Sequence, residues 1–244
     1  MCDGSYAFGM MNRLLLALLI PVLPLWAGEG QEGKLRAGLD ASRVLFLGNS
    51  ITRHGPAPKI GWNDDWGMAA SAMEKDYVHL VAAGLAELAG KKPEIRFANI
   101  ADFERNLATY DIAAKLKAEF EFKPTLVIVA IGENVPALQT EDAKAQFRTS
   151  LARLLDAARK SGATPALVVR SCFWADAAKD EILRQGCAAA GGIPVDIGAL
   201  GKDESNYARA ERKFEHAGVA AHPGDKGMKA IADAILAALR APAK

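Results

Sequence analysis

The sequence predicts an α/β fold in which helices cover both faces of a mostly parallel sheet. The first observation is size and composition: 244 residues, 50% apolar and 24% charged, suffice for one domain with a full core. The second is that, beyond residue 40, short apolar runs alternate with longer helical patterns, without a low-complexity linker or internal repeat. Strands that alternate with helices indicate parallel pairing and two helical layers.

Five short runs rich in branched apolar residues predict the strands. They cover residues 43–48, 94–100, 125–132, 166–171 and 192–197. Helical patterns lie between and after them, with glycines near several of their ends, where helix C-caps are needed. These patterns cover residues 69–90, 105–120, 141–162, 178–192 and 224–240.

Charge balance and histidine spacing exclude several function classes. The 30 basic and 29 acidic residues give a net charge of +1, and no basic block exceeds two residues, so we expect no nucleic-acid partner. The four histidines have no ligand spacing and "NDDW" is too short for a calcium loop, so we expect no metal and no other cofactor. The first strand–helix turn lacks a glycine-rich phosphate loop, which disfavours a nucleotide-binding domain.

The N-terminal residues predict export to the periplasm or the medium. Arg13 precedes an apolar run at 14–26 that has signal-peptide length but is short for a membrane span, and Ala27 offers a small residue for cleavage. Met10 or Met11 would open a more ordinary signal peptide, and a retained N-terminal anchor is the alternative. The predicted organisation is a signal peptide at 1–27, a linker at 28–40 and one domain at 41–244.

Two cysteines would remain after loss of such a leader, and they leave two interpretations open. In an exported protein, Cys172 and Cys187 could form a disulfide if the strand end and the following helix bring them close. The alternative is a pair of buried free thiols. Neither cysteine has the neighbours of an activated nucleophile.

Small polar and aromatic side chains follow the predicted strands and precede the last helix. Because ligands bind outside the carboxyl ends of parallel strands, we expect these side chains to gather at one edge of the sheet. They are Asn49, Ser50, Asn99, Asn134, Trp174 and His222. A serine, a base and a hydrogen-bond donor are what acyl transfer requires: Ser50 can attack, His222 can take its proton, and the Asn134 amide can stabilise an oxyanion.

Three segments resemble the conserved blocks of the SGNH, or GDSL-type, hydrolases. They are "FLGNSIT" (46–52), "IGEN" (131–134) and "HPGDKGM" (222–228), similar to the first, third and last blocks. The first block has Asn49 in place of the usual aspartate. The resemblance implies a three-layer, flavodoxin-like α/β/α sandwich with a five-stranded parallel sheet of order 2-1-3-4-5. It also implies Ser50 as nucleophile, Asn134 as oxyanion donor and His222 as base.

The second block departs from the family pattern. The glycine whose N–H completes the oxyanion hole is replaced by Glu104, so the resemblance implies an oxyanion hole built from the N–H groups of Ser50 and Glu104 and the side chain of Asn134. A backbone N–H survives this replacement. We expect the carboxylate of Glu104 to point elsewhere, toward Arg105 or Arg53.

The catalytic acid of the family is also missing. Its position, three residues before His222, holds Val219. Glu215, Asp225 or a main-chain carbonyl near 217–220 could accept from the second ring nitrogen, and the small-residue loop favours the carbonyl. The working mechanism is a Ser–His dyad held by backbone, and loss of activity is the alternative.

The loop at 53–68, directly after the nucleophile, is long enough to shape one wall of a cleft. His54 could contact substrate or lie on the surface. Trp62 and Trp66 could stack on a sugar ring or pack the loop against the core. Trp174 has the stronger claim to a substrate contact because it follows a strand at the predicted catalytic edge.

These features predict an exported serine esterase that hydrolyses carboxylic esters. The expected partner is a small-molecule or glycan ester, with acetylated carbohydrate as the favoured substrate, and we expect no stable membrane span once the signal peptide is removed. The tryptophan-bearing rim and the predicted export favour a carbohydrate. A lipolytic esterase or thioesterase of the same fold is one alternative. A non-catalytic protein that binds carbohydrate or the cell envelope is the other.

Overall fold

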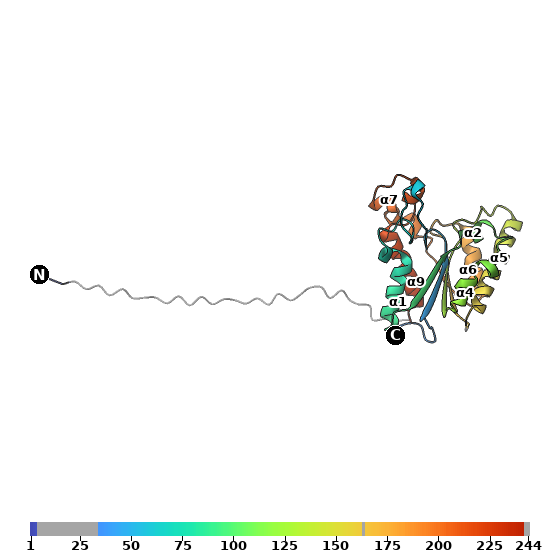
Figure 1. Cartoon of the computed structure of the whole chain (residues 1–244), viewed down its shortest axis with the longest axis horizontal. Coiled ribbons are helices and arrows are strands. Elements are labelled where there is room, and N and C mark those ends of the chain that lie inside the picture. Colours follow the sequence, from blue (N-terminus) through green and yellow to red (C-terminus); the bar gives the residue numbers. More distant parts are fainter. Residues whose placement is uncertain (4–33, 163, 242–244) are drawn as a thin grey trace. The chain divides into compact units, whose positions relative to one another are not determined.

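The computed structural model describes residues 1–3, 34–162 and 164–241. Nearly all of the predicted signal peptide, and the first part of the predicted linker, lie outside the described residues. From Lys34 onward the described chain forms one unit in which helices flank a central sheet (Figure 1).

The sheet has five parallel strands in the order β2-β1-β3-β4-β5, which confirms the predicted fold class and strand order. They are β1 (Arg43–Gly48), β2 (Glu94–Asn99), β3 (Leu126–Ala130), β4 (Ala166–Arg170) and β5 (Ile193–Val195). The two central strands, β1 and β3, place Phe46 opposite Ile128. Both strands are buried almost throughout, because helices cover both of their faces.

The longer helices form the two outer layers. α1 (Tyr77–Ala89) and α9 (Asp225–Leu239) lie on one face, and α5 (Glu141–Lys160) and α6 (Ala177–Ala189) lie on the other (Figure 1). The shorter helices are α2 (Ala101–Arg105), α3 (Ile112–Lys115), α4 (Lys117–Glu121), α7 (Ala208–Glu211) and α8 (Ala217–Ala220), with single 3-10 turns at η1 (Pro58–Ile60), η2 (Met73–Lys75), η3 (Leu200–Lys202) and η4 (Glu204–Asn206). Within the described residues, no helix is long and apolar enough to cross a membrane.

The helix predicted at 69–90 begins later than expected, at Tyr77. Asp76 caps it, because its carboxylate accepts from the His79 N–H at 2.8 Å. Ala69, at the start of the predicted span, has φ of 72°, a left-handed conformation that an α-helix cannot contain. The prediction followed apolar spacing and missed this cap.

The helix predicted at 105–120 is interrupted rather than continuous. α2 ends at Arg105, and a turn separates it from α3. Asp111 then caps α3 by accepting from the Ala114 N–H at 3.0 Å. The short helices α2, α3 and α4 therefore replace one long helix between β2 and β3.

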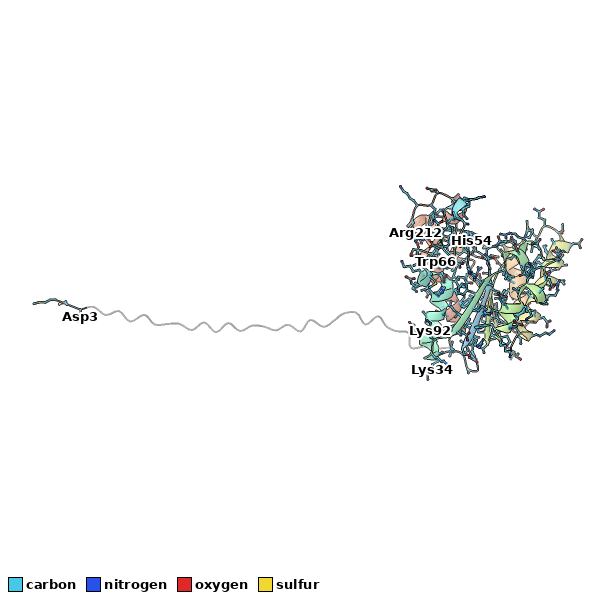
Figure 2. The ribbon with its side chains drawn as sticks, viewed as in Figure 1. Asp3, Lys34, His54, Trp66, Lys92 and Arg212 are labelled. Carbon is cyan, nitrogen blue, oxygen red and sulfur yellow. The ribbon has the colours of Figure 1, made fainter. Side chains whose placement is uncertain are left out.

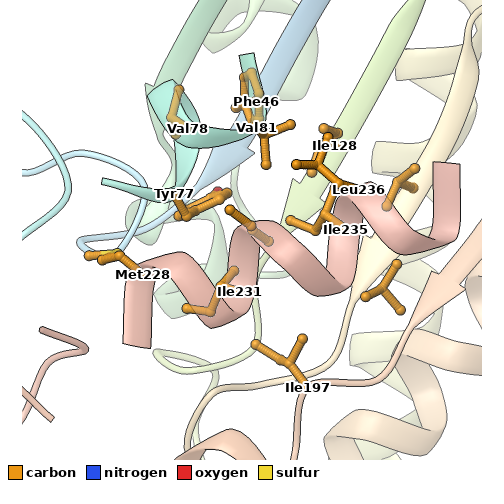
Figure 3. Close-up of a cluster of buried hydrophobic side chains, with 14 of the residues drawn as sticks. Phe46, Tyr77, Val78, Val81, Ile128, Ile197, Met228, Ile231, Ile235 and Leu236 are labelled. Carbon is orange, nitrogen blue, oxygen red and sulfur yellow. The ribbon is translucent and has the colours of Figure 1, made fainter. Parts of the chain in front are cut away.

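Two apolar clusters join the layers. In one, Tyr77, Ile231 and Ile235 of α1 and α9 pack against the central strands (Figure 3). In the other, α5 and α6 pack on the opposite face, where Phe147 and Leu151 are fully buried. Each such side chain contributes about 1.5–3 kcal/mol by leaving water. The two clusters fix the sheet, and with it the edge where the strands end.

Cys172 and Cys187 are both buried and both free thiols. Burial raises the pKa of Cys187 to about 11 and also raises the pKa of Cys172. Of the two interpretations that the sequence left open, the structure has the free thiols and not the disulfide.

Candidate active site

Ser50 stands in a tight turn directly after β1, at the carboxyl edge of the sheet. The Asn49 carbonyl accepts from the N–H groups of Thr52 and Arg53 at 2.9 and 3.0 Å, which closes the turn. Gly48 is required at its start, because a Cβ there would lie 1.9 Å from the Thr52 hydroxyl oxygen. The turn leaves Ser50 partly exposed at the end of a buried strand.

His222 lies within hydrogen-bond distance of the serine. Its Nε2 is 2.8 Å from the Ser50 hydroxyl oxygen, and its Nδ1 is 2.7 Å from the Gly218 carbonyl oxygen. A carbonyl only accepts, so Nδ1 carries the proton and Nε2 is free to accept from Ser50. Val219, at the position of the missing acid, is buried in an apolar cluster instead. The Ser50–His222–Gly218 row therefore has a backbone carbonyl where a triad has a carboxylate.

Backbone contacts and one aromatic ring hold the His222 loop. The His222 N–H donates to the Val219 carbonyl at 3.0 Å, and its carbonyl accepts from the Ala208 N–H at 2.8 Å. The Trp174 ring packs against the imidazole edge to face, with ring centroids 5.3 Å apart. Helices α7 and α8 thus set the backbone position, and Trp174 limits rotation of the ring.

The surroundings of His222 favour its neutral form. Burial lowers its pKa below the ordinary value, and the electrostatic interaction with nearby His54 lowers it further. The hydrogen bond to Gly218 and the charge of Glu133 act in the opposite direction but do not reverse the shift. A neutral imidazole is the form that can act as a general base.

Ser50 lies in the wall of a cleft with a volume of about 510 Å³. It is lined by Ser50, His54, Ile60, Met68, Asn99, Ala101, Asp102, Arg105, Asn134, His216, Gly218, Val219 and His222. The structure therefore brings Ser50, Asn134 and His222 together from distant parts of the chain. A second cavity, of about 550 Å³ between α6 and β5, contains none of the predicted site residues.

Two candidate donors belong to residues that line this cleft. The Ser50 N–H has no hydrogen-bond acceptor among the described residues. The Asn134 side-chain nitrogen donates one hydrogen to Glu104 at 2.9 Å and has a second one to offer. Glu104, the third predicted donor, is fully buried and does not line the cleft, and its N–H is directed to the Ile100 carbonyl at 3.4 Å within the first turn of α2. The role of this N–H in an oxyanion hole stays a prediction, and in this structure the N–H contacts the Ile100 carbonyl instead of the cleft.

The side chain of Glu104 also lies differently from expected. It points inward to the Gly132 N–H at 2.6 Å and the Asn134 side-chain nitrogen at 2.9 Å. It does not contact Arg53, which pairs with Asp65 through two bonds of 2.7 Å. The prediction failed because donors in the loop after β3 and in the turn after β1 contact the carboxylate in place of the exposed arginines.

Glu133, beside Asn134, forms a buried ion pair. Its carboxylate accepts from Arg170 at 2.5 Å, from the Phe173 N–H at 2.9 Å and from the Asn49 amide at 2.7 Å. Burial by itself raises the pKa of this carboxyl, but the charge of Arg170 outweighs it and holds the pKa below its usual range. The pair ties the end of β4 to the turn that carries the serine.

The three predicted substrate contacts have different positions. His54 lines the cleft, and its Nδ1 is 2.6 Å from the Gly55 carbonyl oxygen. Trp66 packs edge to face on Trp62 and donates to the Ala70 carbonyl at 3.1 Å, so it is not part of the cleft lining. Trp174 contacts His222 rather than the cleft. Figure 2 shows His54 and Trp66 toward the same end of the domain.

Sequence reasoning did not assign three polar residues to the cleft. Asp102, Arg105 and His216 all line it. The first two follow the second strand in "ADFER", and polar residues at a strand end were the available signal. Within the described part of the chain, no group of acidic, histidine or cysteine side chains is arranged to hold a metal ion.

Comparison with known proteins identifies the fold. No family model and no curated protein matches the sequence. Among solved structures, a protein described as a GDSL-like lipase from Parabacteroides merdae matches with a TM-score of 0.55 at 16% identity, over 85% of this chain and 98% of the other.

Two further solved structures agree. The lipase/acylhydrolase from Enterococcus faecalis has a TM-score of 0.50 at 16% identity, over 83% of this chain and 98% of its own. A carbohydrate esterase family 3 protein from Talaromyces cellulolyticus has a TM-score of 0.51 at 18% identity, over 80% and 94%. Together with the strand order, these similarities show that the chain has the fold of the SGNH, or GDSL-type, hydrolases.

Proposed function

We propose that this chain is a serine ester hydrolase that works through an acyl-Ser50 intermediate. The observation that carries the proposal is the hydrogen-bonded row from Ser50 through His222 to the Gly218 carbonyl, with distances of 2.8 and 2.7 Å. A weak nucleophile beside an oriented base is the arrangement that acyl transfer requires.

In the proposed reaction, His222 Nε2 takes the Ser50 hydroxyl proton while the serine oxygen attacks the ester carbonyl carbon. The oxyanion lies against the Ser50 N–H and the Asn134 amide. His222 returns the proton to the departing alcohol, which leaves an acyl-serine. Water then adds to the acyl carbon as His222 takes its proton, and the serine oxygen leaves with that proton, so that a carboxylic acid is released.

Turnover of p-nitrophenyl acetate tests this proposal. Ser50→Ala should lower kcat by about 10³-fold or more, because among the described residues only the Ser50 hydroxyl is hydrogen-bonded to His222. Ser42→Ala, at an exposed position before β1, is the matched control and should keep the wild-type rate. Equal, background-level rates for wild type and Ser50→Ala would contradict the proposal and favour the non-catalytic binding protein.

Acetylated carbohydrate is the favoured substrate class within this proposal. The residues Asp102 and Asn99, which carry a carboxylate and an amide, line the cleft beside Ser50, and such groups bind sugar hydroxyls better than a lipid chain. One structural neighbour is described as a carbohydrate esterase. Higher kcat/KM on acetylated oligosaccharides than on long-chain p-nitrophenyl esters would support this choice, and the reverse preference would favour the lipolytic esterase or thioesterase.

Export also belongs to the proposal. It is supported by the apolar run after Arg13 and the small residue Ala27. N-terminal sequencing of protein recovered from periplasm or medium should give a start at or near Gly28. Recovery of the uncut chain with the membrane fraction would favour a retained anchor.

A further inference from the structure

Glu104 is a buried carboxylate surrounded by donors. One oxygen accepts from the N–H groups of Gly132 and Asn134 at 2.6 and 3.2 Å and from the Asn49 amide at 3.3 Å. The other oxygen accepts from the Asn134 side-chain nitrogen at 2.9 Å. The carboxylate thus joins the serine turn to the loop that carries the candidate oxyanion donor.

Arg105 contacts the opposite end of the same amide. Its guanidinium donates to Asn134 Oδ1 at 2.9 Å, while Glu104 accepts from Asn134 Nδ2. An asparagine amide can turn over, exchanging oxygen and nitrogen. Here a cation that only donates meets the oxygen, and a carboxylate that accepts meets the nitrogen, so only one orientation satisfies both.

We propose that Glu104 and Arg105 form a clamp that positions the Asn134 amide, so that its second Nδ2 hydrogen stays directed at the oxyanion. This inference rests on the proposed ester hydrolysis, and it makes both clamp residues positioning residues that act through Asn134. A preorganised donor stabilises developing charge without reorganising during the reaction, which is the reason that orientation affects rate.

The hydrogen-bond partners of Glu104 suit a carboxylate, because four donors and no acceptor surround its oxygens among the described residues. Burial raises the pKa of Glu104 and the charge of Glu133 raises it further, while the hydrogen bonds from Gly132 and Asn134 oppose this rise without reversing it. Glu133 is itself compensated by Arg170 at 2.5 Å. In Glu104→Gln, an amide nitrogen replaces one carboxylate oxygen. This nitrogen only donates, so it would face the surrounding donors and leave at least one of them without an acceptor.

Ester hydrolysis by Glu104→Gln, Asn134→Ala and the double variant tests the clamp. Glu104→Gln should lower kcat by about 10²-fold with little change in KM, because loss of one oxyanion donor has this size. In the Asn134→Ala background, Glu104→Gln should cause no further loss, since its effect passes through the missing amide. Asp180→Asn is the matched control: it also removes a carboxylate that accepts from two backbone N–H groups, but away from the Ser50 cleft.

Arg105→Gln provides a test that does not depend on a buried residue. The side chain is 57% exposed, so the variant should fold, and kcat should fall by about two- to tenfold through loss of one hydrogen bond, with Arg105→Lys in between. A wild type without Ser50-dependent turnover would overturn the proposed function. Two results with an active wild type would overturn the clamp alone. One is that Glu104→Gln and Arg105→Gln keep the wild-type kcat. The other is that their losses in kcat add to the loss caused by Asn134→Ala.

Discussion

At the level of single residues, the His222 ring is held by a neutral group. The Gly218 carbonyl fixes the tautomer as a carboxylate would, but it brings a dipole where a triad brings a full negative charge. It therefore orients the base well and stabilises the imidazolium less. Burial lowers the pKa of His222 for the same reason, since no opposite charge in direct contact compensates the loss of water.

The pH dependence of kcat/KM should reflect this lowered pKa. His222 must be neutral to accept the serine proton, and a lowered pKa keeps it neutral to more acidic conditions. We expect the acidic limb of the pH–rate profile to lie below pH 6.5, about the value of an unperturbed histidine. If the acidic limb of kcat/KM for p-nitrophenyl acetate lies above pH 6.5, about the ordinary histidine value, then the protein stabilises the cationic form of His222 instead.

Val219→Asp should not restore a triad. Val219 is 1% exposed and packs with Trp62 and Met68, so a carboxylate there would lose water without gaining a cationic partner. We expect a lower Tm and no gain in kcat, with Val219→Thr as a milder polar control at the same site. A higher kcat at unchanged Tm would mean that the loop re-forms around an acid.

At the level of elements, close packing of α9 against η4 fixes the position of the His222 loop. Gly227, in the first turn of α9, would put a Cβ 2.2 Å from the Asn206 carbonyl oxygen. The same carbonyl accepts from the Gly224 N–H at 2.9 Å, two residues after His222. Because Gly227 has no side chain, the first turn of α9 can pack directly against the backbone that holds the His222 loop.

Gly227→Ala should test this packing. Alanine normally favours a helix over glycine, but here the added methyl group meets rigid backbone, and overpacking of this kind costs about 1–3 kcal/mol. We expect a lower Tm together with a lower kcat, because α9 would move with the His222 loop. Lys229→Ala, exposed on the same helix, should leave both unchanged; a Tm at or above wild type for Gly227→Ala would contradict this account.

The strands could be predicted from sequence far better than the helices near the site. β1, β3 and β4 are buried, branched runs whose composition follows from two covered faces. The start of α1 is set by the cap residue Asp76, whereas apolar spacing alone predicted a start at residue 69.

At the level of the whole molecule, the site divides into a predictable and an unpredictable part. Ser50, Asn134 and His222 follow strand ends or precede the last helix, so topology alone gathers them. The inward turn of Glu104 depends on how α2 packs over the loop after β3, which local sequence does not specify. To predict such contacts, one must know the relative register of β1, β2 and β3, because the residues in contact follow all three strands.

Thiol reactivity should follow global unfolding. Cys172 and Cys187 are buried in the same cluster, and burial raises the pKa of both, so neither should react with a thiol probe in the native protein. Both should react in denaturant without added reductant. Failure of both to react there would indicate a disulfide, and rapid reaction in the native state would indicate a looser core.

The beginning and the end of the described domain meet on the side away from the cleft. The Ala241 N–H donates to the Lys34 carbonyl at 2.8 Å. Next to this bond, Leu35 and Arg240 form an antiparallel β-bridge. The 15 residues of α9 carry the chain there from the His222 loop, a distance of about 22 Å. A short peptide could therefore join the two ends and create a circular permutant, in which new termini are opened elsewhere while the hydrogen bonds around Ser50 stay intact.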